Sequence, residues 1–334
     1  MSASINTTPT NDLLSNEILS NELLSSEELA TTNKPIQIRA LLIINPNSRS
    51  GAEANIDEGI QILESAGFAL IKTESKSAAE TARLIDQHYK NIELVIIGGG
   101  DGSINSAAEA VYRHQLTLAI LPLGTANDLA RSLGLPNDLL EVFNIIAANK
   151  RRKVDLGKFG GHYFFNAANI GLGVHVTREL TAEFKKRWGV LSYLHAALIA
   201  FKSHRAFRAK IIVDGVQHKF KSIQIAIGNG RFYGGGNIID ERASIDDGLL
   251  NLYSLPPQSL WELLRMAPWL RAGKYRRLER TFNTEGQCIE IHTVPQREIY
   301  ADGEPVCKTP VVFEIIPQAI NVIHLEPVGP DARV

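Results

Sequence analysis

The pattern of apolar and polar positions changes near the middle of the chain. Up to about residue 150, apolar runs with the length of buried strands alternate with stretches of helical periodicity. The apolar runs cover 38–45, 68–73, 93–99 and 116–124, and the helical stretches lie around 52–66, 77–90 and 103–113. Strands and helices in alternation predict a parallel sheet with both faces covered.

After Arg151 the apolar runs become shorter and are separated by turn signals. Asp214-Gly215 between two such runs is a strong hairpin signal. Helical stretches are expected near 187–203 and 258–273, and separate strands at 311–317 and 320–326. We therefore expect an α/β protein with an α/β domain at 36–150 and an antiparallel β-rich sandwich domain at 151–326, whose final strand packs back on the first domain.

The first 35 residues follow neither pattern. A five-residue quasi-repeat runs from Asn11 to Ala30, and residues 1–33 hold five acidic residues and no Lys or Arg. A period of five spreads leucines around a helix instead of forming one apolar stripe, so we expect a disordered acidic tail. The alternative, a pentapeptide β-helix, needs more stacked repeats than four to bury a core.

Composition narrows the function classes only slightly. The 334 residues, 44% of them hydrophobic and 21% charged, suit a globular protein of two domains. The net charge of −1 gives no charge-based argument for or against a partner, and we expect no nucleic-acid partner. Two cysteines fit a reducing compartment better than a disulfide framework. No signal-peptide pattern and no run of roughly 18 apolar residues is present, so we expect a cytoplasmic protein.

A glycine-rich turn follows the third apolar run. Its glycines, Gly98, Gly99, Gly100 and Gly102, surround Asp101. In an open parallel sheet, ligands bind beyond the carboxyl ends of the strands, where a helix presents free N–H groups. Absent side chains let these groups close around a phosphate, and an aspartate there invites a divalent cation. The alternative is a tight structural turn.

The next strand also ends in a polar turn that contains glycine. Thr125 with Asp128 resembles a capping box at a helix start, and Gly134 before Pro136 is a typical stop. A well-capped short helix explains these residues without any ligand. Two consecutive strands that end in such turns nevertheless form one wall of a single crevice.

Six motifs in order resemble the diacylglycerol kinase catalytic-domain family, which comprises soluble bacterial lipid kinases and the related sphingosine and ceramide kinases. The resemblance runs from about residue 37 to 325, and its motifs are NPNSRSG (45–51), GGGDGSIN (98–105), LPLGTANDLA (121–130), GNGRFYGGG (228–236), DDGLL (246–250) and DGEPV (302–306). It implies a fold like that of diacylglycerol kinases and NAD kinases. It also implies ATP-dependent, Mg²⁺-assisted phosphorylation of a lipid hydroxyl, with the nucleotide bound between the two domains.

The same resemblance implies the binding and catalytic residues. Those implied for the nucleotide are Asn45, Ser48, Thr73, Gly98, Gly99, Gly100, Asp101, Gly102, Ser103, Ile104, Asn105, Thr125 and Glu304. Asp302 is implied as the proton acceptor from the lipid hydroxyl, whereas the sphingosine kinase branch implies Asp101. Local sequence cannot separate Asp302 from Asp214, because both stand in Asp-Gly turns.

Two Mg²⁺ sites are implied as well. Asp101 and Asp155 match acidic positions of a network near the phosphates, although Asp155 reads locally as a surface strand residue. A second site, away from the chemistry, would use Asp247 and the carbonyls of Ser244 and Leu249, all oxygen ligands that suit Mg²⁺. An Asp-Gly turn is the alternative reading of that loop.

The chain departs from the family in two places. Ser106, Glu109 and Ala110 stand where the family continues its glycine motif with Glu and Asn-Gly. Glu241 replaces a family proline near the second metal loop.

Two stretches could meet a lipid surface. Residues 185–205 and 260–280 combine apolar with basic residues, and the second holds six basic and two acidic residues with Trp261 and Trp269. Aromatic and basic groups together favour transient peripheral contact with a membrane. Ordinary surface helices are the alternative.

The leading hypothesis is thus a kinase of a lipid alcohol such as diacylglycerol. The alternatives are an NAD kinase-like enzyme that phosphorylates a soluble dinucleotide and a catalytically inactive regulator that binds nucleotide or lipid. The sequence leaves open which lipid is the acceptor and whether the chain forms a homodimer.

Overall fold

The computed structural model describes residues 37–48, 56–171, 206–259, 281–301 and 304–325, together with 261, 262, 265, 269 and 272–274. Three features predicted from the sequence lie outside the described residues: the acidic tail, the helix at 187–203, and Asp302. Of the helix predicted at 258–273, Trp261, Glu262, Arg265 and Trp269 are described, and all four are helical.

The first half of the fold is the α/β structure that the apolar pattern predicts. Its parallel strands lie in the order β2-β1-β3-β4. They are β1 (Ile38–Ile44), β2 (Phe68–Glu74), β3 (Leu94–Gly99) and β4 (Thr117–Pro122). The helices between and after them are α2 (Asp57–Ser65), α3 (Ala78–His88), α4 (Asp101–Arg113), α5 (Asp128–Ser132) and α6 (Leu139–Ala148), with the 3₁₀ turn η1 (Tyr89–Asn91).

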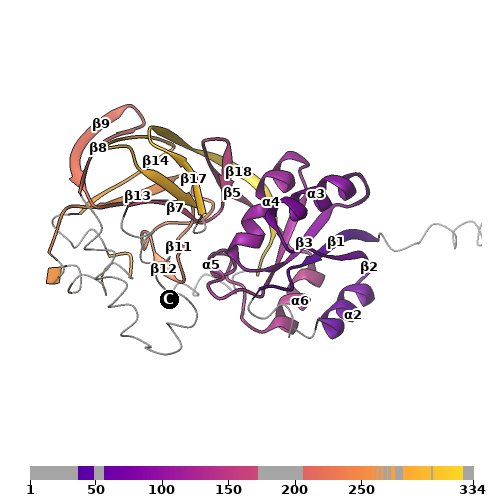
Figure 1. The fold of residues 1–334 in the computed structure, drawn as a ribbon. Coiled ribbons are helices and arrows are strands. Elements are labelled where there is room, and N and C mark those ends of the chain that lie inside the picture. Colours follow the sequence, from indigo (N-terminus) through magenta and orange to yellow (C-terminus); the bar gives the residue numbers. More distant parts are fainter. Residues whose placement is uncertain are drawn as a thin grey trace, which may run out of the picture. The chain divides into compact units, whose positions relative to one another are not determined.

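These helices cover both faces of the parallel strands, as Figure 1 shows. Apolar side chains of α3 and α4 pack on one face, and those of α2 and α6 pack on the other. Strand β3 is buried along its whole length, which explains its unbroken apolar run. The sequence did not single out α6, which shields the second face next to α2.

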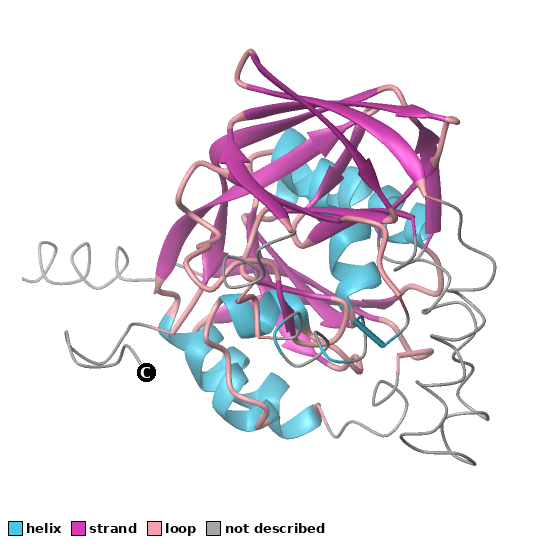
Figure 2. Ribbon diagram, turned by 90° about the vertical axis from the view of Figure 1, so that its left-hand side faces the viewer, coloured by secondary structure: helices cyan, strands magenta, loops and turns pink. Residues whose placement is uncertain are grey.

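The strands of the second half are mainly antiparallel, and in the described residues they lie in a sheet shared with the first half, in a six-stranded sheet and in the two-stranded sheet β11-β12. These strands are β5 (Arg151–Phe159), β6 (His162–Phe164), β7 (Ala167–Gly171), β8 (Phe207–Val213), β9 (Val216–Ser222), β10 (Gln224–Gly228), β11 (Phe232–Tyr233), β12 (Asn237–Ile238), β13 (Leu250–Leu255), β14 (Phe282–Gly286), β15 (Cys288–Val294), β16 (Glu298–Ala301), β17 (Glu304–Lys308) and β18 (Val311–Ile323). Figure 2 views the molecule from the side on which these strands lie in Figure 1, with all strands in magenta. The expected hairpin at Asp214-Gly215 is confirmed, with φ of 47° and 88°.

Among the described residues, one sheet of ten strands runs through both halves. Its main path is β2-β1-β3-β4-β18-β15-β8-β9, and off this path β5 pairs with β18 and β6 pairs with β5. A second, six-stranded sheet of described residues has the order β14-β13-β10-β7-β16-β17. Phenylalanines and branched residues fill the space between the two sheets, among them Phe159, Phe207 and Phe313.

Strand β18 corrects the expectation of two separate strands at its position. It is continuous over 13 residues, with a register shift between Ile316 and Ile320 and a positive φ of 51° at Gln318. Before the shift it pairs with β15, and after it Asn321 pairs with Thr117 of β4 in parallel. The bulge bends the strand. The break in the apolar pattern between 317 and 320 therefore marks the point where β18 changes its partner from β15 to β4, and the chain does not turn there.

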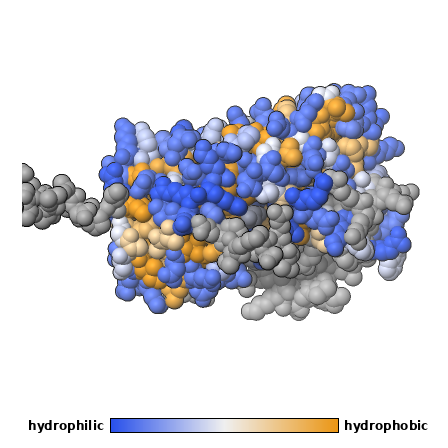
Figure 3. Space-filling model, turned by 180° about the vertical axis from the view of Figure 1, so that it is seen from behind, coloured by the Kyte–Doolittle hydropathy of each residue, from blue (hydrophilic) through white to orange (hydrophobic). Residues whose placement is uncertain are grey.

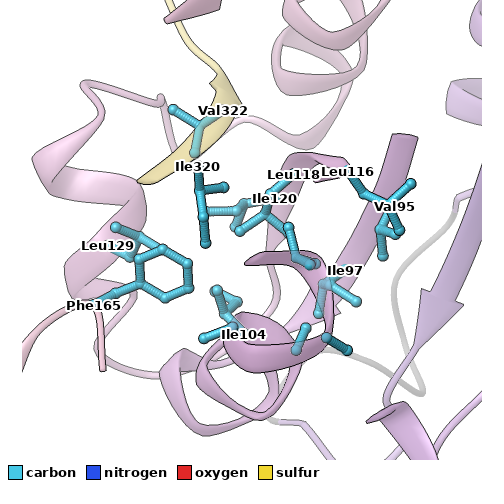
Figure 4. Close-up of a cluster of buried hydrophobic side chains, with 14 of the residues drawn as sticks. Val95, Ile97, Ile104, Leu116, Leu118, Ile120, Leu129, Phe165, Ile320 and Val322 are labelled. Carbon is cyan, nitrogen blue, oxygen red and sulfur yellow. The ribbon is translucent and has the colours of Figure 1, made fainter. Parts of the chain in front are cut away.

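One apolar core contains side chains from both halves. Figure 4 shows Ile104 of α4 and Leu129 of α5 lying toward Phe165 and Ile320 from the second half. On the face in Figure 3, hydrophilic residues predominate and hydrophobic ones form separate groups. Within the described part of the chain, no helix is long and apolar enough to cross a membrane.

Candidate functional site

A cavity of about 450 Å³ lies beyond the carboxyl ends of the parallel strands. Its lining residues follow β1, β2, β3 and β4, so every strand of the parallel part contributes. They are Asn45, Ser48, Ser75, Lys76, Ser77, Ala78, Thr81, Gly100, Gly102, Ser103, Ser106, Gly124 and Thr125. This is the edge of the sheet at which the two glycine turns predicted a crevice.

Two glycines bring the turns after β3 and β4 into direct backbone contact. A Cβ built on Gly124 would lie 2.4 Å from the Cα of Gly100, and one on Gly100 would lie 3.2 Å from the Cα of Gly124. Real Cβ atoms do not approach backbone atoms to 2.4 Å, so Gly124 accepts no side chain here without movement. The contact makes both turns part of one cavity wall.

Helix α4 directs its free N–H groups at this wall. It begins at Asp101, two residues earlier than the periodicity predicts, with Gly100 at the N-cap position. Gly100 has no side chain that could cap the first amides, and a Cβ on Gly102 would meet nothing within 4 Å. The first turn therefore combines unsatisfied donors, the positive end of a 13-residue helix and open space, which together suit an anion.

The cavity is lined mainly by hydroxyl and amide groups. The Asn45 Nδ2 donates to Ser103 Oγ at 2.8 Å, and Ser106 Oγ donates to the Ser103 carbonyl at 2.7 Å. Ser106, at one of the departures from the family pattern, is thus part of the cavity wall. Asn45 ties the end of β1 to the first turn of α4.

Sequence reasoning missed the segment that follows β2. Ser75, Lys76, Ser77, Ala78 and Thr81 line the cavity, whereas Thr73, the residue implied by the resemblance, does not. Among the described lining residues, Lys76 is the only one with a charged side chain. The signal was available, because β2 belongs to the same parallel sheet and its carboxyl end must reach the same edge.

The other residues implied for the nucleotide lie in various surroundings. Gly98 and Gly99 are packed inside, where Cβ atoms would meet Ile44 and Ser103. Ile104 is 1% exposed in the core. Asn105 donates to the Tyr163 carbonyl and accepts from the Phe165 amide, so it joins α4 to the second half.

Asp101 is held from two separate elements. Its Oδ1 accepts the Leu129 amide at 3.1 Å and the Asn166 Nδ2 at 3.0 Å. None of the described residues forms a hydrogen bond to Oδ2. This leaves one carboxylate oxygen beside the first turn of α4 for other contacts.

Asp128 corrects the capping-box prediction. The prediction placed Asp128 in a capping box with Thr125 as the N-cap. The side chain is instead 2% exposed and accepts the amides of Gly235 and Gly236, at 2.9 and 2.7 Å. Asn127 precedes α5 in the left-handed region and bonds Gly124 instead, while Gly134 ends the helix region at φ 71° as predicted. Burial raises the pKa of the Asp128 carboxyl, and the charge of Asp101 adds to the rise, against the opposing effect of the Gly235 amide.

A second acidic pair lies where the loop before β13 meets β5 and β18. Asp155 is 1% exposed, so it is no surface residue, and its carboxylate accepts the Gly248 and Gln318 amides at 2.6 and 2.7 Å. Asp247 accepts the Ser244 and Leu249 amides, both at 2.9 Å. Burial raises the pKa of Asp247, and the neighbouring charge of Asp155 contributes to the rise.

Metal binding was predicted for Asp101 together with Asp155, and for Asp247 together with the carbonyls of Ser244 and Leu249. In the described part of the chain, no three carboxylate, imidazole or thiol side chains converge as a metal centre. A site built from one carboxylate and two main-chain carbonyls, as implied for Asp247, therefore stays a prediction. So does the role of Asp302, which lies outside the described residues, between Ala301 at the end of β16 and Glu304 at the start of β17.

Comparisons with known proteins agree with this architecture. Residues 39–159 match the diacylglycerol kinase catalytic domain, and residues 167–324 match the YegS C-terminal NAD kinase beta sandwich-like domain. A protein of Pseudomonas savastanoi pv. phaseolicola named "Probable lipid kinase YegS-like" is 31% identical over 293 residues, which cover 86% of this chain and 94% of the relative. A protein of the same name from Pseudomonas aeruginosa (strain UCBPP-PA14) is 33% identical over 300 residues, which cover 88% of this chain and 97% of the relative.

Solved structures from Bacillus anthracis str. Sterne share the fold. One has a TM-score of 0.74 at 25% identity and covers 88% of this chain and 97% of its own. Another, a diacylglycerol kinase by name, has a TM-score of 0.69 at 20% identity; the match covers 87% of this chain and 98% of that structure's chain.

Replacing Gly124 by alanine tests the contact between the two turns. We expect Gly124→Ala to lower the free energy of unfolding by about 1–3 kcal/mol, because the added methyl group must displace backbone. Urea denaturation would measure the change. Gly102→Ala serves as the control, since its Cβ meets nothing within 4 Å, and it should change stability by less than about 1 kcal/mol. Equal losses in the two variants would contradict the close contact.

Proposed function

Because the chain belongs to the family of YegS-like lipid kinases, we propose that it transfers the γ-phosphate of ATP to the hydroxyl of a lipid alcohol such as diacylglycerol. The observation that carries the proposal is the cavity formed where bare backbone of two turns meets the uncapped first turn of α4. Phosphoryl transfer depends chiefly on positioning and on neutralising charge, and this wall is suited to both.

The described residues fit the phosphates of a nucleotide. The space beside Gly102 and the free amides of the first turn of α4 would receive phosphate oxygens, as helix N-termini do in other nucleotide sites. Ser103, Ser106 and Thr125 add hydroxyl groups to the same wall, and no described lining residue carries a negative charge. The cavity thus offers donors and one cation to an anionic ligand.

The residues also fit a magnesium ion. When bound, ATP supplies the phosphoryl group and Mg²⁺ neutralises charge on the phosphate oxygens. Asp101 would hold the ion, because Leu129 and Asn166 fix its Oδ1 and leave Oδ2 available. Both carboxylate oxygens of Asp155 accept main-chain amides, so we propose that Asp155 supports the surrounding loops and does not hold the ion directly.

The proposed proton acceptor is Asp302, with Asp101 as the alternative. Asp214 stands in a similar Asp-Gly turn, between β8 and β9, and has structural partners. Its carboxylate accepts the main-chain amides of Gln287 and Cys288, which lie between β14 and the start of β15. Ala301, the last described residue before Asp302, pairs with Ala168 near the start of β7. Asn166, the partner of Asp101, stands directly before that end of β7.

Purified protein incubated with labelled ATP, Mg²⁺ and a panel of lipids tests the function directly. We expect a phosphorylated lipid. Formation of NADP from NAD would support the NAD kinase-like alternative, and no product from any acceptor would support the inactive regulator. Asp302→Asn should lower turnover by about 100-fold or more while the dissociation constant of ATP stays within about threefold, because a lost base affects chemistry and not nucleotide binding.

Asp214→Asn is the matched control for Asp302→Asn, since both remove a carboxylate from an Asp-Gly turn. Its turnover per folded molecule should stay close to that of the unmodified protein. Undiminished turnover in Asp302→Asn would remove Asp302 from the proposed role.

Lys76 gives a second test, on nucleotide binding alone. Lys76→Met removes the only charged side chain among the described lining residues. The variant should bind ATP about tenfold more weakly and adenosine with little change, because the lysine would contact the phosphates, which adenosine lacks. Calorimetry would measure both. Lys72→Met is the control, as Lys72 pairs with Glu64 at 2.8 Å outside the cavity wall. An equal loss of affinity for ATP and for adenosine would contradict a contact between Lys76 and the phosphates.

We also propose that the helical residues Trp261, Arg265 and Trp269 make transient contact with an anionic membrane surface. Trp261 is 82% exposed, Trp269 is 42% exposed, and the exposed Arg265 lies between them at a spacing of four residues. A spacing of four keeps side chains on one helix face. The six basic residues in 260–280 match the negative charge of such a surface.

Sedimentation with vesicles that contain phosphatidylglycerol tests this contact. Trp261→Ala should reduce the bound fraction about three- to tenfold, and salt should weaken binding in both proteins because basic residues contribute. Val216→Ala, which removes an apolar side chain that is 61% exposed in another region, is the control and should bind like the unmodified protein. Indistinguishable binding of the two variants would contradict a membrane face at Trp261.

A further inference from the structure

Asn166 is a buried amide between the two halves of the fold. It is 7% exposed and stands directly before β7, between Phe165 and Ala167. Its side chain makes one hydrogen bond to the described residues, from Nδ2 to Asp101 Oδ1 at 3.0 Å, across 65 positions of sequence. Its Oδ1 is buried and has no hydrogen-bond partner among the described residues.

The orientation of this amide follows from its chemistry. An ionised carboxylate can only accept, so Nδ2 must face Asp101, and the reverse orientation would place two acceptor oxygens against each other. Because Nδ2 donates to Asp101, Oδ1 points to the other side, where it has no hydrogen-bond partner among the described residues. A buried amide with an unpaired oxygen is less favourable for stability than an apolar side chain of similar size.

The surroundings show that joining the halves does not require Asn166. Asn105, one turn after Asp101 on α4, already holds the Tyr163 carbonyl and the Phe165 amide. The Asn166 main chain has its own partner, since its carbonyl accepts the Asn229 amide at 2.9 Å. What the Asn166 side chain adds is a donor for the Asp101 carboxylate.

We propose that Asn166 is a positioning residue that fixes the Asp101 carboxylate in the orientation the phosphoryl-transfer reaction uses. Together with the Leu129 amide it holds Oδ1 from two directions, so that Oδ2 is the oxygen available beside the first turn of α4. Without this donor the carboxylate can turn about its side-chain bonds, and small displacements in an active site cost large factors in rate. The inference rests on the proposed function.

A set of variants separates positioning from structural support. Asn166→Ala removes the donor, Asn166→Asp keeps the shape but places a second carboxylate against Asp101, and Asn166→Ser retains a small donor. Asn169→Ala is the matched control, because Asn169 lies three residues along in β7 and also has a buried Oδ1 without a partner among the described residues. Thermal unfolding confirms that each variant is folded.

The kinetic result expected is a split between kcat and KM. Asn166→Ala and Asn166→Asp should lower kcat about 30-fold or more and change the KM for ATP less than about threefold, because Asp101 and not the nucleotide wall is disturbed. Asn166→Ser should recover at least about fivefold over the alanine variant, since the serine hydroxyl can donate. Asn169→Ala should stay within about twofold of the unmodified protein. An alanine variant within about threefold in kcat, or a serine variant no better than alanine, would overturn the proposal.

Hydrogen exchange provides a measure that does not depend on turnover. Since Asp101 Oδ1 also accepts the Leu129 amide, its displacement should speed exchange in residues 128–132 in Asn166→Ala and Asn166→Asp but not in Asn169→Ala. Should the unmodified protein phosphorylate no lipid, the proposed function fails while this measurement still decides the positioning. Unchanged exchange at Leu129 in every variant would overturn it.

Discussion

The contact between the backbones of Gly100 and Gly124 is the constraint on which the candidate site depends. Two adjacent parallel strands, β3 and β4, end in turns that touch with no side chain between them. Because of this contact, the uncapped first turn of α4 and the loop before α5 line one cavity. A side chain at Gly124 would overlap the backbone of Gly100, so the contact requires glycine at position 124, whereas a Cβ on Gly100 would require only a small shift.

The second half of the fold is joined to this wall by buried polar contacts. Strand β18 passes from the antiparallel sheet to a place beside β4, with a bulge where its partner changes. Asp128 reaches the amides of Gly235 and Gly236, and Asn105 reaches the segment before β7. These bonds connect the glycine motif at 228–236 to the turn after β4, although more than one hundred residues separate them.

The acidic residues differ in what their surroundings leave available. Asp128 and Asp155 are almost fully buried and have both oxygens hydrogen-bonded to backbone amides, an arrangement that stabilises loops. Asp101 has one oxygen held twice, and none of the described residues bonds the other. This difference, which local sequence does not show, is the basis for proposing that Asp101 takes part in the chemistry and that Asp128 and Asp155 support the fold.

The alternation of strands and helices up to about residue 150, apart from α6, followed from the chain alone, because the apolar period and the turn residues act within a few positions. The glycine turn, its Asp101 and the resemblance to lipid kinases were readable for the same reason. The partners of Asp128, the continuity of β18 and the bond from Asn166 to Asp101 were not. Each joins segments far apart in sequence, and such contacts arise when strands take their places in a sheet and bury polar groups that must then find partners.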